Sequence, residues 1–229
     1  MARPALKSTR NAPRDGETSA EAVARYVRRL VFEGKLEDGQ RLPQDDIADA
    51  VGVSRIPVRE AIIALEREGW VSVVRHRGAF VNALGPQAVM DRFTLYGRFY
   101  GFAARRSVER MTPEALEALR AHARDVAKAT SPAAFERANT AYLSTLVRLA
   151  GSNRLRAVLR STAQIVPGNF FAGVPNSIQV QRDGITEIQA ALEAGDTARA
   201  ERAFASIEAR HGAEVVALMN ARRAESLEP

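Results

Sequence analysis

The stretch that decides the fold runs from Gln44 to Asn82 and reads QDDIADAVGVSRIPVREAIIALEREGWVSVVRHRGAFVN. Its pattern predicts a short helix, a tight turn, a longer helix and a two-stranded hairpin. Gly52 stands where the first helix must end, because glycine readily adopts the left-handed conformation found there. Ser54 follows as an N-cap whose hydroxyl is able to accept from an amide of the next helix. Pro57 falls in the first turn of that helix, where its missing N–H removes no hydrogen bond.

One face of the second helix is apolar at helical spacing, through Val58, Ala61, Ile62 and Leu65, and is expected to be buried. Arg55 and Arg59 lie one turn apart beside this face, near the helix N-terminus, so both are expected to point outward. This layout is typical of a helix-turn-helix whose second helix enters the DNA major groove. Two arginines alone are common on a solvated helix face. Their order with the cap, the proline and the hairpin favours DNA binding.

The residues GVSRIPVREAIIALEREGWV, followed by RGAFV, closely resemble the winged-helix domain of GntR-family bacterial transcription regulators. The resemblance extends without a gap from about Ala20 to Asn82. It implies that the hairpin tip Arg75-His76-Arg77-Gly78 is a wing beside the recognition helix. His76 is at least as well explained as a solvent-facing side chain. The DNA-contacting residues predicted in this way are Arg41, Ser54, Arg55, Pro57, Arg59, Arg75, Arg77 and Gly78.

Composition limits the function without deciding it. The chain has 229 residues, of which 46% are apolar, and no cysteine, which excludes disulfides and thiolate ligands. The first residues lack the apolar core of a signal peptide and no run reaches membrane-spanning length, so we expect a cytoplasmic protein with no membrane partner. The net charge is +6. Residues 17–82 nevertheless carry ten basic and eleven acidic side chains. The placement of the arginines, rather than total charge, therefore predicts DNA binding.

From Gln87 onward the pattern predicts only helices, over 87–110, 113–129, 132–150, 153–166, 176–194 and 197–223. The short connections favour a compact antiparallel bundle. Residues 167–175 (PGNFFAGVP) are expected to form a longer irregular loop, held to the core by Phe170 and Phe171 or serving as a lid or dimer contact. The predicted fold class is mainly α, with an N-terminal winged helix-turn-helix domain followed by an all-α antiparallel helical bundle. The predicted domains are a disordered basic arm (1–16), the winged helix (17–83) and the bundle (86–224).

The bundle resembles the FCD-type domain of the FadR subfamily, through the phrases TPEALEAL, LAGSNRL and ALEAGDTARAERAF. Many members of that subfamily hold a divalent metal through one aspartate and three histidines. In a register taken from the last two phrases, these ligands fall at Asn139, Leu143, Ile185 and Ile207. Leucine and isoleucine have no lone pair for a metal, so the resemblance implies no metal, and we expect no cofactor. His122 and His211, the only histidines of this region, make no ligand pattern.

The same comparison puts Tyr96 and Tyr100 where related proteins often have an arginine and a glutamate near the effector. Two interpretations follow for the set Tyr96, Tyr100, Asn139, Leu143, Ile185 and Ile207. In one, these side chains simply fill the bundle. In the other, they line an apolar pocket for a small-molecule effector, with the tyrosine hydroxyls and the asparagine amide as its polar groups.

The leading hypothesis is a homodimeric regulator, a repressor, that binds an inverted-repeat operator in double-stranded DNA. An alternative is a ligand-independent DNA-binding dimer whose helical domain serves only assembly. A third hypothesis makes the helical domain an enzyme. Nothing in the sequence supports it, because the chain has no cysteine, few histidines and no carboxylate pair with convincing spacing.

Overall fold

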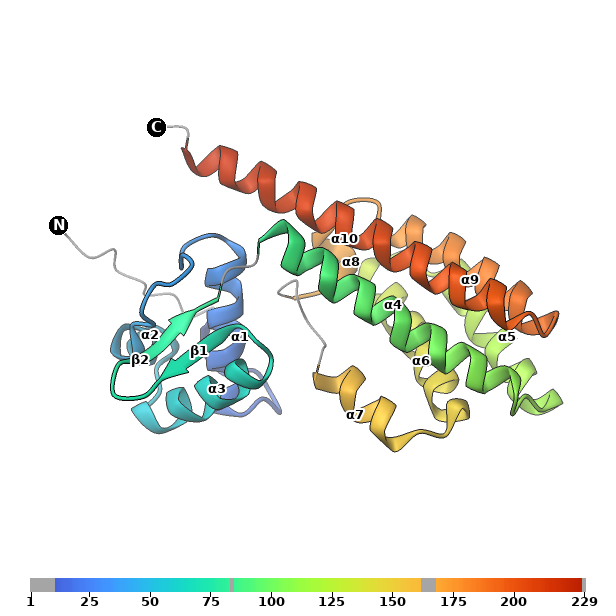
Figure 1. Cartoon of the computed structure of the whole chain (residues 1–229), viewed down its shortest axis with the longest axis horizontal. Helices are drawn as coiled ribbons and strands as arrows, with labels where there is room; N and C mark the ends of the chain where they lie inside the picture. The colour runs from blue at the N-terminus through green and yellow to red at the C-terminus, as the bar shows by residue number, and fades with distance from the viewer. Residues whose placement is uncertain (1–10, 83–84, 162–167, 228–229) are drawn as a thin grey trace. The chain divides into compact units, whose positions relative to one another are not determined.

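The computed structural model describes residues 11–82, 85–161 and 168–227, and divides the chain into two compact units between Gly85 and Pro86 (Figure 1). Among the described residues, no helix is both long enough and apolar enough to span a membrane.

The first unit is a three-helix winged helix with a small antiparallel sheet (Figure 1). Its elements are α1 (Ser19–Phe32), α2 (Gln44–Val51), α3 (Arg55–Arg67), β1 (Val71–Val74) and β2 (Gly78–Val81). Thr18 and Glu21 form the capping box that starts α1, each side chain bonding the other residue's backbone amide. Gly52 ends α2 with a φ of 77°, the left-handed conformation expected at this position.

The apolar face of α3 is buried as the sequence predicted, through Val58, Ala61, Ile62 and Leu65. In the hairpin Val71 pairs with Val81 and Val74 with Gly78, so the chain turns between residues 74 and 78. Trp70, which precedes β1, is 2% exposed and anchors the sheet to the core. The hairpin is therefore attached at its base while its tip extends into solvent.

The predicted disordered arm does not hold for Asn11, which is 2% exposed. Its Nδ2 donates to the Ala50 carbonyl oxygen (3.3 Å), and Arg29 donates to its Oδ1 (2.5 Å). The last carbonyls of a helix lack intrahelical partners, so this amide satisfies one of them at the end of α2. Residues 1–10, which make up most of the predicted arm, lie outside the described part of the chain.

The second unit contains only helices within its described residues: α4 (Pro86–Val108), α5 (Pro113–Lys128), α6 (Pro132–Ala150), α7 (Asn153–Ser161), α8 (Phe170–Gly173), α9 (Ser177–Glu193) and α10 (Thr197–Leu227). Thr112 and Ser131 cap α5 and α6 through their hydroxyls, and a proline follows each cap. The predicted helix over 153–166 is observed as far as Ser161, and residues 162–166 are outside the described range. The short α8 lies in the stretch predicted as an irregular loop.

Two glycines of α4 let α10 lie unusually close beside it. A β-carbon on Gly97 would lie 3.2 Å from the Ala205 Cα and 3.3 Å from the Glu208 Cβ. Four residues later, a β-carbon on Gly101 would lie 3.4 Å from the Glu201 Cα. The helices run antiparallel, since successive positions along α4 meet earlier positions of α10. This contact fixes where the side chains of α10 enter the bundle.

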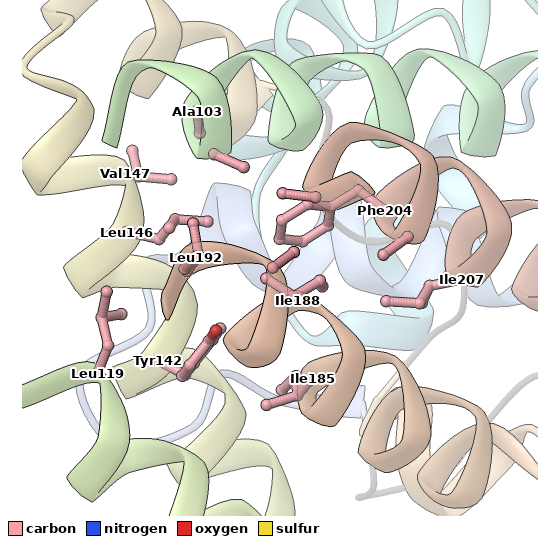
Figure 2. Packing of buried hydrophobic residues seen from close by; sticks show 14 of the residues in the cluster. Ala103, Leu119, Tyr142, Leu146, Val147, Ile185, Ile188, Leu192, Phe204 and Ile207 are labelled. Carbon is pink, nitrogen blue, oxygen red and sulfur yellow. The ribbon is translucent and has the colours of Figure 1, made fainter. Parts of the chain in front are cut away.

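The core of the bundle is built from α4, α5, α6, α7, α9 and α10, and Figure 2 shows its central side chains. Tyr142, Phe204 and Ile188 are almost completely buried at its centre. Ile185 and Ile207 belong to the same cluster, at 2% and 3% exposed, and are labelled in the close-up (Figure 2). Side chains of this kind account for most of the stability of such a bundle, through the apolar surface that they remove from water.

Candidate nucleic-acid interface and a pocket in the helical unit

The first turns of α3 carry the two arginines predicted to read DNA, and both are exposed. Arg55 forms a two-point ion pair with Asp45 of α2, at 2.7 Å from Nε and 2.9 Å from Nη2. The side chains of this pair are 69% and 65% exposed. Exposed pairs contribute only ~0–1 kcal/mol, so a DNA base or phosphate is able to displace Asp45. Arg59 makes no hydrogen bond or ion pair within the described part of the chain.

Ser54 occupies the N-cap position of α3, but its side chain makes no capping hydrogen bond, contrary to the prediction. The exposed hydroxyl and the first amides of α3 thus stay available to an anion at this helix start. Pro57, in the first turn, is half-buried and removes no intrahelical bond, as its position implied.

The wing is a tight basic turn in which two residues have positive φ angles. His76 has a φ of 62° and Gly78 a φ of 105°, while the Arg77 amide donates to the Val74 carbonyl oxygen (3.0 Å). Arg75, His76 and Arg77 are all exposed at this tip. The Arg77 guanidinium lies 5.8 Å from the centre of the Phe80 ring, within the range of a cation–π contact.

Arg41 lies against the base of this wing. Its backbone pairs with that of Phe80 in a single antiparallel β-bridge. Its side-chain Nε would be 3.1 Å from a β-carbon placed on Gly78. Gly78 therefore serves two purposes, since it adopts a backbone conformation that disfavours other residues and leaves space for the Arg41 side chain. The structure thus brings Arg41, Arg77 and Gly78 together.

The helical unit contains a pocket of about 200 Å³ between α4, α6, α8, α9 and α10. Four of the six predicted effector residues line it, namely Tyr96, Tyr100, Asn139 and Leu143. Burial raises the pKa of the Tyr100 hydroxyl, which therefore stays protonated at neutral pH. The Tyr96 hydroxyl lies 3.5 Å from the Leu159 carbonyl oxygen.

Ile185 and Ile207 do not line the pocket, which corrects that part of the prediction. Their places are taken by Gln181 of α9 and His211 of α10. Gln181 precedes Ile185 by four residues on α9, and His211 follows Ile207 by four residues on α10. Because α9 and α10 are consecutive helices joined by a short turn, both shifts go in the same direction along the bundle. The pocket lining thus lies four residues, or about 6 Å, further along each helix than the two isoleucines.

Glu208, Phe170 and Phe171 also line the pocket and are absent from the predicted set. The FF pair was recognised only as a core anchor or a lid. Glu208 precedes His211 by three residues on α10, and this i, i+3 spacing was the signal that both share one helix face.

The residues present do not fit the metal that this type of domain often holds. No group of three or more histidine, cysteine, aspartate or glutamate side chains is placed to bind an ion in the part of the chain that the structure covers. Glu136, Glu208 and His211 line the pocket without forming such a group, and Asn139 and Leu143 contribute an amide and an alkyl group. A structural or catalytic divalent site needs more charged or imidazole ligands than this.

Comparison with known proteins shows matches to two family models. Residues 19–81 match the gntR family of bacterial regulatory proteins, and residues 101–210 match the FCD domain. An uncharacterized HTH-type transcriptional regulator of Mycobacterium tuberculosis H37Rv is 31% identical over 162 residues, which are 71% of this chain and 66% of that protein. A second such regulator of the same strain is 25% identical over 219 residues, 87% of this chain and 90% of that protein.

Solved structures share the fold. A GntR-family transcriptional regulator from Pseudomonas syringae pv. tomato superposes with a TM-score of 0.56 at 22% identity, covering 95% of this chain and 92% of that one. The Listeria monocytogenes protein Lar gives a TM-score of 0.60 at 20% identity, covering 87% of this chain and 97% of that one. With its winged helix, its helical second unit and both family matches, the chain belongs to the GntR family of bacterial regulatory proteins and carries an FCD domain.

Proposed function

We propose that this chain represses transcription in the cytoplasm by binding an inverted-repeat DNA operator as a homodimer. The observation that supports this most directly is the exposed pair Arg55 and Arg59 on α3, in the same compact unit as a basic wing. Arginine forks recognise the O6 and N7 atoms of guanine in the major groove. In this proposal α3 reads bases.

Phosphate contacts come from the remaining predicted residues. Ser54 and the half-buried Pro57 lie at the start of the recognition helix, where the free backbone amides are able to bind a phosphate. Arg75 and Arg77 form the basic wing, and Gly78 leaves room for Arg41 against the base of this wing. Such contacts set the register of the protein on the duplex without reading sequence.

Arg59→Ala tests the base-reading assignment. The operator is first selected from a random-sequence duplex pool with the wild-type protein, and Kd is then measured by fluorescence anisotropy for the operator and a scrambled duplex. Loss of one two-point base contact removes about 1–3 kcal/mol of discrimination, so the ratio of the two Kd values should fall by roughly 5- to 150-fold.

The matched control is Arg67→Ala, which removes an exposed arginine from the last turn of the same helix. It should keep the wild-type ratio. An Arg59→Ala protein that folds normally and discriminates as well as the wild type would show that α3 does not read bases through this residue.

The second unit supports two roles, sensing an effector or assembly alone. The pocket between α4 and α10 favours sensing, because it combines apolar walls with buried polar groups, the usual composition of a small-molecule site. Assembly alone remains the second candidate, because Ile185 and Ile207 fill the core rather than a ligand site. Ligand-dependent stabilisation of the fold separates the two roles.

A further inference from the structure

We propose that the pocket of the helical unit binds a small organic cation, an amine carried on an apolar or aromatic body. This inference rests on the proposed sensing role and gives that site a ligand class. It differs from the metal-bound ligands for which domains of this type are often built, because the described lining does not suit a metal.

The first observation is a buried carboxylate that makes no hydrogen bond to any residue that the structure describes. Glu208 is 8% exposed and lines the pocket, and the His211 Nδ1 lies 3.9 Å from its Oε2. That distance is too long for a hydrogen bond. Removing a carboxylate from water is costly unless donors or a cation compensate it, so Glu208 stabilises a positively charged group entering the pocket.

His211 does not supply that compensation as a neutral ring. Its Nε2 lies 3.4 Å from the Ser177 carbonyl oxygen, which can only accept, so this contact favours the tautomer with hydrogen on Nε2. Nδ1 then carries a lone pair on the side nearer Glu208. Both groups accept, and a ligand that donates to them satisfies both.

Asn139 and Gln181 add further unmatched polar atoms. The Gln181 Nε2 donates to the Asn139 Oδ1 (2.9 Å), which leaves the Gln181 Oε1 without a hydrogen bond to any described residue. Gln181 is 3% exposed and lines the pocket. Its carbonyl oxygen is thus a second acceptor on a residue of the lining, and an ammonium group with three donors matches several acceptors better than a carboxylate does.

Aromatic side chains make up much of the remaining wall. Tyr96 and Tyr100 lie 5.3 Å apart, Phe93 and Phe170 lie 6.2 Å apart, and Phe170 and Phe171 lie 5.4 Å apart, measured between ring centres. Aromatic rings attract cations through their electron-rich faces and bury apolar groups well. A lining of this kind is suited to an amine with an apolar body.

The ionisable side chains that line the pocket also favour a positively charged ligand. Arg92 and Glu136 contribute one charge of each sign, so Glu208 leaves the described lining with a net negative charge when His211 is neutral. Residues 162–167, which are not described, contain no ionisable side chain in the sequence (TAQIVP). The volume of about 200 Å³ limits the ligand to a small molecule.

The test compares ligands that share a body and differ in charge. Phenethylamine, benzylamine and cyclohexylethylamine are measured against 2-phenylethanol, 3-phenylpropionate and Zn²⁺ alone, by thermal shift and isothermal titration calorimetry on the full-length protein without DNA. At least one amine should raise the melting temperature with saturable heats, whereas the alcohol and the carboxylate should not. Stabilisation by the carboxylate or by Zn²⁺ alone, or silence from all three amines, would overturn the proposal.

Glu208→Gln removes the charge while keeping the shape of the side chain. It should weaken amine binding by about 10- to 100-fold, as expected for a hydrogen bond to a charged group. Glu208→Asp keeps the charge on a shorter side chain, so its amine affinity should lie between those of Glu208→Gln and the wild type. Glu201→Gln, an exposed position on the same helix, should bind like the wild type. Equal amine affinities for Glu208→Gln and the wild type would also overturn the proposal.

The calorimetry uses no DNA, so it does not depend on operator binding. A protein that binds amines without discriminating between duplexes would contradict the proposed regulator alone. One that discriminates but ignores amines would contradict only the ligand class.

Discussion

At the residue scale, the ion pair with Asp45 sets the conformation of the Arg55 side chain in the protein without DNA. Both carboxylate oxygens of Asp45 meet the guanidinium, at 2.7 and 2.9 Å. A two-point pair of this kind fixes the plane of the guanidinium as well as its position. Asp45 thus holds Arg55 in one orientation while neutralising the charge that would attract any duplex.

Asp45→Asn should therefore have opposite effects on affinity and on selectivity. Removing the carboxylate frees the charge of Arg55, so Kd for a scrambled duplex should fall by roughly 2- to 10-fold, as expected for about 0.5–1.4 kcal/mol. The operator should gain less, because Arg55 loses its fixed orientation. Fluorescence anisotropy with both duplexes measures this, and Asp49→Asn on the same helix is the control. Equal gains on the two duplexes would contradict the orienting role of Asp45.

At the element scale, the packing of α4 on α10 depends on Gly97 more than on Gly101. Replacing either glycine with alanine favours the helix by about 1 kcal/mol. At Gly101 the added carbon meets ordinary contact distances, starting at 3.4 Å. At Gly97 it meets the Ala205 Cα at 3.2 Å and the Phe204 carbonyl oxygen at 3.3 Å. Backbone atoms cannot move aside without moving the helix.

Gly97→Ala should consequently lower the free energy of unfolding relative to Gly101→Ala. Overpacking costs about 1–3 kcal/mol, which exceeds or cancels the gain in helix propensity, whereas Gly101→Ala should be neutral or stabilised by up to about 1 kcal/mol. Urea denaturation followed by circular dichroism gives both values. A Gly97→Ala protein as stable as Gly101→Ala would show that the two helices separate at little cost.

The helices themselves were predictable because their signals are local. The pairs Thr112-Pro113 and Ser131-Pro132 each provide a cap and a first-turn proline within two residues, and the structure starts α5 and α6 there. The stretch 170–173 is a single helical turn, too short to show a helical period, so α8 was not anticipated.

The pocket was only partly predictable because it depends on how distant helices align. Tyr96 and Tyr100 share one face of α4, which local spacing reveals. Gln181 and His211 lie at the same level of the α9–α10 hairpin, and whether they face the pocket depends on the offset of that hairpin against α4 and α6. Short amphipathic phrases do not fix that offset, which is why Ile185 and Ile207 were expected in the pocket and lie in the core.

At the scale of the whole molecule, the proposed dimer needs an apolar surface that a monomer leaves open. Leu95 and Phe102 lie seven residues apart on one face of α4 and are 53% and 38% exposed. Exposed apolar patches of this kind often mark protein interfaces. We propose that this face of α4 contributes to the contact between two copies of the chain.

Leu95→Glu should shift the protein toward monomer, because a charge at the centre of an apolar interface must be desolvated without a partner. Sedimentation velocity gives the oligomeric state, and the operator Kd should rise with dissociation because a monomer contacts one half-site. Arg124→Ala, an exposed change on α5, is the control. A Leu95→Glu protein that stays dimeric would place the interface elsewhere.

The ion pair of Arg55 with Asp45 also has a consequence for how ionic strength governs the affinity. Each guanidinium that takes up a phosphate normally releases condensed counterions, which steepens the decline of affinity with salt by about 0.9 per contact on logarithmic axes. Arg55, which is proposed to read a base, exchanges its anionic partner Asp45 for an uncharged base edge and therefore takes up no phosphate. Counting the arginines at the DNA interface would therefore overestimate the dependence of log affinity on log salt concentration by close to one contact per subunit.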